Sequence, residues 1–170
     1  LASVAVNSRV VFDDVYIEGI TKITAKDIKY AKEMGCDIKL LGVAKNTEDG
    51  VEAYVCPMLI PSSHPLASVN DSYNAVFLTG DAVQDTMFYG RGAGELPTAS
   101  AVVGDIFDVV RNILWNCCGR IGCTCYKELP VKKMADTCNR YFMRLIVEDR
   151  CGVLAEMTAV FAKYGVSVAQ

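Results

Sequence analysis

The sequence predicts an α/β (α+β) protein with a mixed sheet and helices packed on it, followed by a smaller, incomplete α/β unit. Three observations lead to this fold class. A glycine-rich turn runs into a strongly amphipathic helix, two strand patterns flank a short polar turn, and a strand–loop–helix pattern lies near the end of the chain. Of the 170 residues, 52% are hydrophobic and 22% are charged, which is typical of a chain with its own core.

The composition argues against nucleic acid and membrane as partners. The formal net charge is −3 and no long basic stripe is present, so a polyanion finds no attractive surface. No apolar run approaches the roughly 20 residues of a membrane span, and residues 1–6 are too short for a signal peptide. Eight cysteines in a chain of this size favour reduced thiols and a cytoplasmic location. We expect small molecules and other subunits as partners.

Two helices are predicted near the start of the chain. Residues 1–6 have the pattern of the last turns of a buried helix. Thr24 with Asp27 three residues later forms a near capping box that opens the next helix, and Gly35 ends it. Because residues 1–6 resemble a helix already under way and residues 166–170 a strand cut short, we expect both ends to be breaks in a longer protein.

A β-hairpin is predicted next. Residues 38–44 have a strand pattern, residues 45–50 a polar turn, and residues 51–60 the pattern of the antiparallel return strand. Pro57 has no backbone N–H to donate, so we expect the return strand to be at an edge of the sheet or bulged at that point.

A buried strand at residues 73–79 and a turn at Gly80-Asp81 precede residues 82–89, which lead to a turn rich in glycine. Gly90, Gly92 and Gly94 permit unusual backbone angles and a close approach to a ligand. The start of the following helix presents free N–H groups, which favour an anion. The spacing does not match the dinucleotide-binding fingerprint, and a purely structural strand-to-helix connection is the alternative.

The helix after this turn is expected to bury one face. Pro97 suits its first turn, and Thr98 or Ser100 are candidates for its cap. The apolar residues that recur at helical spacing are Ala99, Val102, Val103, Ile106, Val109, Val110 and Ile113.

Residues 116–138 are expected to be a linker between two domains, at residues 1–115 and 139–170. The stretch has five of the eight cysteines and basic residues that include Arg120, but it lacks sustained periodicity. Its cysteines, at Cys117-Cys118 and Cys123-x-Cys125, do not have the usual knuckle spacing, so we expect free thiols and no metal. A thiol or metal protein built on this cluster remains the alternative.

A second unit is predicted after the linker. Residues 141–147 have a strand pattern, residues 148–152 form a tight loop, and residues 153–164 are expected to be a helix. Gly165 is expected to cap that helix, and Val166 to begin a second strand.

Several sequence runs resemble homoserine dehydrogenase. They are Asn7-Ser8-Arg9-Val10, Tyr16-Ile17-Glu18-Gly19-Ile20, Leu59-Ile60-Pro61, Asn74-Ala75-Val76-Phe77, Gly80-Asp81-Ala82-Val83, Thr86-Met87-Phe88-Tyr89 and the glycine-rich turn with its helix. Together they cover about the first two thirds of the chain. The run from Val147 to Leu154 is similar to the first loop of an ACT domain, a ferredoxin-like regulatory fold, with Cys151 where proline is common in that family.

The resemblance implies interconversion of L-homoserine and L-aspartate 4-semialdehyde with NAD(P), in threonine and methionine biosynthesis. It implies that no catalytic residue lies in this chain, because the family's lysine and acidic residues precede the equivalent of Leu1, as does the nucleotide-binding domain. The chain alone is therefore expected to be inactive. The turn implied to contact the cofactor comprises Gly92, Ala93, Gly94 and Thr98. Arg91 replaces a proline frequent in the family, which predicts a more mobile turn.

The ACT resemblance implies feedback regulation by an amino acid, with threonine as the expected effector, in a homo-oligomer. Backbone N–H groups at the helix start would receive the effector's carboxylate, and the candidate residues are Asp149, Gly152 and Val153. A plain β–α turn is the structural alternative, and a non-catalytic amino-acid-sensing ACT regulatory protein is the functional one. Because only half of the ACT fold is present, we expect it to be loosely held or covered by a neighbouring chain.

Overall fold

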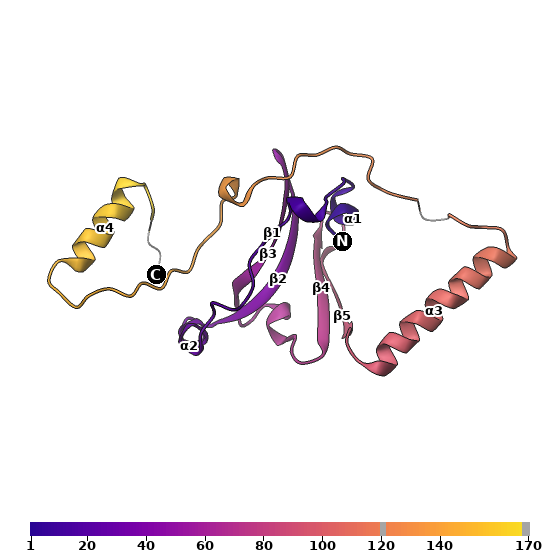
Figure 1. Ribbon diagram of the computed structural model, residues 1–170, viewed down its shortest axis with the longest axis horizontal. Helices are drawn as coiled ribbons and strands as arrows, with labels where there is room; N and C mark the ends of the chain where they lie inside the picture. Colours follow the sequence, from indigo (N-terminus) through magenta and orange to yellow (C-terminus); the bar gives the residue numbers. More distant parts are fainter. Residues whose placement is uncertain (120–121, 168–170) are drawn as a thin grey trace. The chain divides into compact units, whose positions relative to one another are not determined.

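The structure is a computed structural model that describes residues 1–119 and 122–167. Two compact units make up the chain, the first at Leu1–Asn139 and the second beginning at Arg140. Figure 1 shows the order of the elements along the chain. None of the helices within the described residues combines the length and apolar character needed to span a membrane.

Two helices lie in the first part of unit 1. Helix α1 (Ala2–Val6) ends at Asn7, whose φ of 53° is left-handed. Helix α2 (Ala25–Glu33) begins after Thr24, whose backbone N–H donates to the Asp27 carboxylate at 2.8 Å. The Asp27 N–H in turn donates to Thr24 Oγ1 at 3.4 Å, which completes the predicted capping box. Gly35, with a φ of 68°, follows the helix end as predicted.

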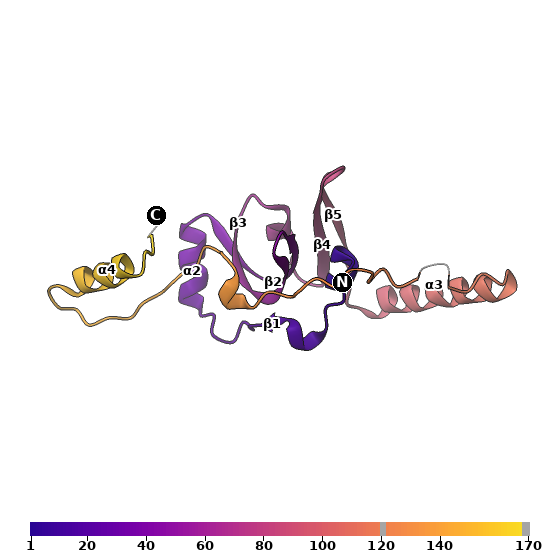
Figure 2. The ribbon, with the colours of Figure 1, turned by 90° about the horizontal axis from the view of Figure 1, so that it is seen from above.

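The main sheet has three strands in the order β1-β3-β2. Strand β1 (Tyr16–Ile17) runs parallel to β3 (Gly50–Pro61), and β2 (Cys36–Thr47) runs antiparallel to β3. The predicted hairpin is confirmed, but its strands are longer than expected because pairing continues to Thr47 and Gly50. Only Glu48 and Asp49 remain in the turn. Helix α2 packs against β2, and Figure 2 shows the sheet from above.

Pro57 occupies a position that is locally an edge. Strand β3 is the middle strand, but β1 pairs only with its residues Tyr54 and Val55. Val55 accepts a hydrogen bond from the side of β1, where Glu18 N–H donates at 2.8 Å. By the two-residue alternation of a strand, Pro57 faces the same side, beyond the end of β1. The missing N–H therefore removes no ladder bond, which fits the expectation for this proline.

The core lies between α1, β3 and a late segment of the chain. Val6, Val51 and Ala53 are buried together, and Val10, Val15, Leu129 and Val131 pack against them. Residues 127–132, which we call the strap, belonged to the expected linker. Their backbone is bonded into unit 1, because Val51 N–H donates to Pro130 O and Lys132 N–H donates to Val51 O, each at 2.8 Å.

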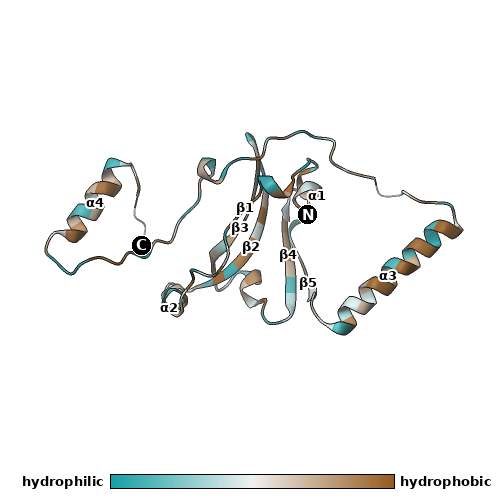
Figure 3. Ribbon diagram, viewed as in Figure 1, coloured by the Kyte–Doolittle hydropathy of each residue, from teal (hydrophilic) through white to brown (hydrophobic). Residues whose placement is uncertain are grey.

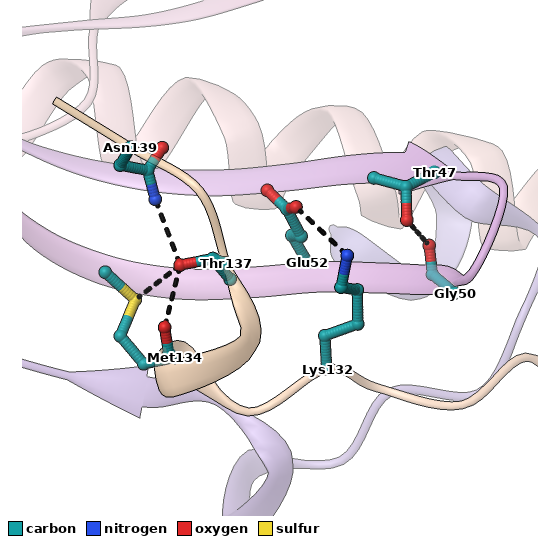
Figure 4. A network of polar contacts seen from close by, with 7 residues as sticks. All are labelled: Thr47, Gly50, Glu52, Lys132, Met134, Thr137 and Asn139. Carbon is teal, nitrogen blue, oxygen red and sulfur yellow. Dashed lines mark hydrogen bonds and ion pairs between the residues drawn. The ribbon is translucent and has the colours of Figure 1, made fainter. Parts of the chain in front are cut away.

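Polar contacts also hold the strap and the residues after it. Lys132 Nζ lies 3.7 Å from the carboxylate of Glu52, whose side chain is only 7% exposed (Figure 4). Further along, the Thr137 hydroxyl donates to Met134 O at 2.8 Å, and Asn139 Nδ2 donates to Thr137 Oγ1 at 3.1 Å. These local bonds lie in the last residues of unit 1, which ends at Asn139.

A separate two-stranded sheet leads to the glycine-rich turn. Strand β4 (Tyr73–Gly80) was expected, whereas β5 (Gln84–Arg91) was predicted only as a connection. The two strands pair antiparallel from Tyr73 and Arg91 to Gly80 and Gln84. The described residues of the first unit also contain three 3-10 turns, at Phe12–Asp14, Pro65–Ser68 and Met134–Asp136.

Helix α3 (Glu95–Leu114) forms as predicted but does not bury its apolar face. None of its residues is buried, and Val102, Ile106 and Val110 are 53%, 56% and 44% exposed. Apolar residues recur along the helix in Figure 3. The prediction of burial was wrong for the described chain, because a helical stripe is buried only where another surface covers it.

The second unit has one helix and no described strand. Helix α4 (Val153–Lys163) is close to the prediction, and its end forms a Schellman motif. In this motif Val166 N–H donates to Phe161 O at 2.9 Å and Gly165 N–H to Ala162 O at 3.2 Å. The strand predicted at residues 141–147 is absent, because a strand forms only with a partner that completes its hydrogen bonds.

Two expectations fall partly or wholly outside the described residues. The predicted second strand begins at Val166, which is irregular together with Ser167, and its continuation at residues 168–170 lies outside them. Arg120, which contributed to the basic character of the expected linker, lies outside them as well.

Candidate functional site

The junction between β5 and α3 depends on the backbone of Gly94. Its φ of 127° and ψ of 154° belong to a region that glycine occupies almost alone. A Cβ atom at Gly94 would also lie 3.3 Å from Pro97 Cδ in the first turn of α3. Gly94 therefore sets the direction in which the chain enters the helix.

The other two glycines of the turn differ in what they contribute. A Cβ atom at Gly92 would overlap Nδ2 of Asn74 on β4, so the absence of a side chain lets the turn lie against that strand. Gly90 is paired with Asn74 in the hairpin, has no left-handed φ, and would meet nothing within 4 Å. The expectation that all three glycines serve special backbone angles is corrected, because only Gly94 does.

Arg91 tethers the start of the turn to β4. Its Nη1 donates to Ser72 Oγ at 3.0 Å, and its guanidinium carbon lies 4.7 Å from the centre of the Tyr73 ring. Tyr73 is itself stacked on Tyr89 of β5, with ring centres 4.8 Å apart and planes 2° from parallel. The sequence predicted a more mobile turn from the loss of proline at Arg91, and the structure adds that the Arg91 side chain contacts Ser72 and Tyr73 next to the turn.

An open hollow of about 670 Å³ lies at this junction. Its lining comprises Arg91, Ala93, Gly94, Glu95, Leu96, Pro97 and Ser100. Two of the four residues predicted to contact a cofactor, Ala93 and Gly94, are among them, while Gly92 and Thr98 are not. Thr98 instead donates its hydroxyl proton to Gly94 O at 2.7 Å. It thereby holds the carbonyl of the glycine that forms the turn.

The first turn of α3, beside the hollow, has backbone N–H groups that no described side chain caps. No side chain within the described residues caps α3, so neither Thr98 nor Ser100 fills the predicted capping role. The N–H groups of Gly94, Glu95 and Leu96 belong to the uncapped first turn, and Arg91 is among the residues that line the same hollow. These donors favour a negatively charged group, and the carboxylate of Glu95 on the rim opposes it.

A smaller hollow lies beside the loop of the second unit. Its volume is about 270 Å³, and its lining comprises Val147, Glu148, Arg150, Val153, Glu156 and Met157. Of the three residues predicted to bind an effector, only Val153 lines it, while Asp149 and Gly152 do not. Gly152 precedes α4 with a φ of 89°, which supports the structural role weighed for it.

Arg150, which the sequence analysis missed, dominates that loop. Its Nη1 and Nη2 donate to the two carboxylate oxygens of Glu156 at 2.9 and 2.7 Å. This pairing lowers the pKa of the Glu156 carboxyl and raises the pKa of the Arg150 guanidinium. The only signal for this pair in the sequence was the opposite charge of Arg150 and Glu156, which are six residues apart on either side of the start of α4.

No metal centre is formed within residues 1–119 and 122–167, where no group of three or more His, Cys, Asp or Glu residues could hold an ion. The single histidine, His64, accepts a hydrogen bond from Leu66 N–H at Nδ1, at 3.1 Å, and packs on Phe77. It caps a short turn.

Comparison with known proteins decides the family. A family model described as homoserine dehydrogenase matches residues 1–107, which is more than half of the chain. The chain belongs to the homoserine dehydrogenase family. The match includes the whole hairpin β4–β5, the glycine-rich turn and most of α3, so the hollow lies within the part that defines the family.

Relatives of this family match nearly the whole chain. The homoserine dehydrogenase of Corynebacterium glutamicum is 46% identical over 174 residues, covering 99% of this chain and 39% of the relative. A crystal structure of a homoserine dehydrogenase from Thiobacillus denitrificans has a TM-score of 0.84 and 35% identity, covering 99% of this chain and 40% of that one. That from Staphylococcus aureus at pH 6.5 has a TM-score of 0.58 and 45% identity, covering 64% and 28%. The chain thus spans about 40% of the length of the curated relatives it matches.

Proposed function

We propose that this chain is part of an NAD(P)-dependent homoserine dehydrogenase that interconverts L-homoserine and L-aspartate 4-semialdehyde. The observation that carries the proposal is the junction at Gly94, which joins a family-defining sequence to an anion-favouring hollow. When bound, the nicotinamide cofactor would accept a hydride from the alcohol carbon of L-homoserine. The pathway would be threonine and methionine biosynthesis, and the location cytoplasmic.

The residues of the turn fit a dinucleotide because they combine close backbone approach with positive potential. Ala93 and Gly94 line the hollow and present backbone without bulky side chains. Gly92 and Thr98 act indirectly in this proposal, the first by letting the turn lie on Asn74 and the second by holding Gly94 O. Arg91 adds a fixed cation beside a phosphate or a carboxamide dipole.

The proton transfer of the reaction is assigned to groups outside this chain. The turn carries backbone donors and one guanidinium, which bind and orient but do not take a proton from an alcohol at neutral pH. We therefore propose that the chain alone does not turn over substrate. Its contribution is to hold one side of the cofactor against the rest of the enzyme.

We propose that the second unit is an ACT-type regulatory element that binds an amino-acid effector, with threonine as the first candidate. The loop before α4 is the proposed site, with Asp149, Gly152 and Val153 around the helix start and Arg150 beside it. Leu154 and Val160 on α4 are 72% and 54% exposed. Exposed apolar residues of this size support the proposal that the unit is covered in a homo-oligomer.

The test uses the full-length protein from which this chain derives. L-Homoserine is supplied with NAD⁺ or NADP⁺, and NAD(P)H absorbance is followed with and without threonine. We expect oxidation of L-homoserine, inhibition by threonine, and no activity from residues 1–170 alone. A folded full-length protein that binds an amino acid but leaves L-homoserine unoxidised would instead indicate a non-catalytic ACT sensor.

A further inference from the structure

Two cysteines lie together immediately before the strap. Cys123 is exposed and Cys125 is half-buried, and Cys125 N–H donates to Cys123 Sγ at 3.4 Å. The Cys123 sulfur is thus turned toward the backbone of Cys125.

The surrounding backbone holds this pair in place. Tyr126 N–H donates to Thr124 O at 2.9 Å, which bends the chain at Cys125. Lys127 N–H donates to Asn7 O at 2.9 Å and begins the strap. Because the chain is fixed to unit 1 two residues after Cys125, this thiol has a defined position beside a more accessible partner.

The hydrogen bonds make the two thiols chemically different. The backbone N–H of Cys125, and then its thiol, donate to the Cys123 sulfur and lower the pKa of Cys123. Donation of that thiol hydrogen bond, with desolvation, raises the pKa of Cys125, while the charge of Arg9 acts in the opposite direction. The thiolate is the reactive form of cysteine. Cys123 is therefore suited to attack an oxidant, and Cys125 to react with the oxidised Cys123 sulfur.

We propose that Cys123 and Cys125 form a dithiol site that a peroxide oxidises to an intrachain disulfide. The Cys123 thiolate attacks one oxygen of hydrogen peroxide, the O–O bond breaks, and the departing hydroxide takes up a proton to become water. The Cys123 sulfenic acid then reacts with the Cys125 thiol, which forms the S–S bond and releases a second water. Two thiols and one peroxide thus yield one disulfide and two waters, and thiol reductants reverse the change.

Three other cysteines, Cys56, Cys117 and Cys118, are held in less reactive settings. Cys117 Sγ donates to Asn112 Oδ1 at 3.4 Å and Cys118 Sγ to Asn112 O at 3.9 Å, so both thiols give their protons to oxygen acceptors. Burial, with the nearby charge of Glu18, raises the pKa of Cys56. Oxidation by limiting peroxide should therefore select the Cys123–Cys125 pair over these three thiols, and the exposed Cys138 and Cys151 have no neighbouring cysteine with which the same sequence separation would form a disulfide.

The sequence allows a direct test by peptide mapping. Cleavage after Arg120 and Lys127 yields a peptide with only Cys123 and Cys125, whereas Cys117 and Cys118 fall in the preceding peptide. The reduced full-length protein is treated with less than one equivalent of hydrogen peroxide, and its free thiols are alkylated. The protein is then digested, and the masses of the peptides are measured by mass spectrometry. We expect the peptide of residues 121–127 to resist alkylation and to lose about 2 Da, the two hydrogens of the thiols, until a reductant is added.

Three variants separate the roles of the sulfurs. In Cys125→Ser, oxidation should stop at a Cys123 sulfenic acid that a 1,3-dione reagent traps. In Cys123→Ser, peroxide consumption at this peptide should slow by roughly tenfold or more, because the lower-pKa thiol is gone. The Cys117→Ser/Cys118→Ser protein is the matched control and should behave as the unaltered protein. Circular dichroism confirms that each variant is folded.

Three results would overturn the proposal. One is a disulfide that joins Cys123 or Cys125 to any other cysteine. The second is an unchanged oxidation rate in folded Cys123→Ser protein. The third is oxidation of Cys117 and Cys118 ahead of this pair. None of these outcomes depends on dehydrogenase activity, so the proposed function and this site are tested independently.

Discussion

Replacing Gly94 by alanine should weaken cofactor binding because no other residue accepts its backbone angles at low cost. A residue with a Cβ atom held at φ 127° and ψ 154° costs about 1–3 kcal/mol, and the added atom would lie 3.3 Å from Pro97 Cδ. If the turn leaves this conformation, the fraction of protein molecules that can bind the cofactor falls by the same factor. At 1.4 kcal/mol per tenfold, the apparent affinity for NAD(P) should fall by roughly 5- to 140-fold.

The assay is the KM for NAD(P)⁺ in L-homoserine oxidation by the full-length protein, with kcat determined alongside it. Gly90→Ala is the matched control, because it adds the same methyl group four residues earlier, where nothing lies within 4 Å and φ is not left-handed. We expect Gly90→Ala to be near neutral. Equal KM values in Gly94→Ala and Gly90→Ala, with both proteins folded, would refute a role for the Gly94 conformation in binding.

Three further predictions concern stability and charge. Lys132→Met should lower the free energy of unfolding by about 3 kcal/mol in urea titrations, because it leaves the Glu52 carboxylate buried without its cation. The double variant Lys132→Met/Glu52→Gln should recover part of this loss, because the buried charge is then removed as well. Thr24→Ala should cost about 1 kcal/mol in the same titration through loss of the α2 cap. By NMR, Glu156 should titrate at higher pH in Arg150→Met than in the unaltered protein. The pair's stabilisation is present above the unfolded glutamate pKa of about 4.3 and is lost as pH falls through the lower folded value.

The elements that could be predicted from the sequence are those whose signals are local. The capping box of Thr24 and Asp27, the end of α2 at Gly35 and the end of α4 at Gly165 each depend on hydrogen bonds within a few residues. The same holds for the strong hairpin β2–β3 and for the junction at Gly94. Family membership could also be predicted, because it depends on the identity of the residues in sequence runs and not on their tertiary contacts.

Only the tertiary structure decided which segments pair across the chain. It gave β5 a partner in β4, bonded the strap to Val51, and placed the Asn74 side chain against Gly92 while leaving Gly90 without a special role. It also left residues 141–147 without a ladder and the apolar face of α3 uncovered within the described chain. Helices satisfy their backbone hydrogen bonds internally, whereas strands, close approaches and buried faces need a distant partner that no local pattern specifies.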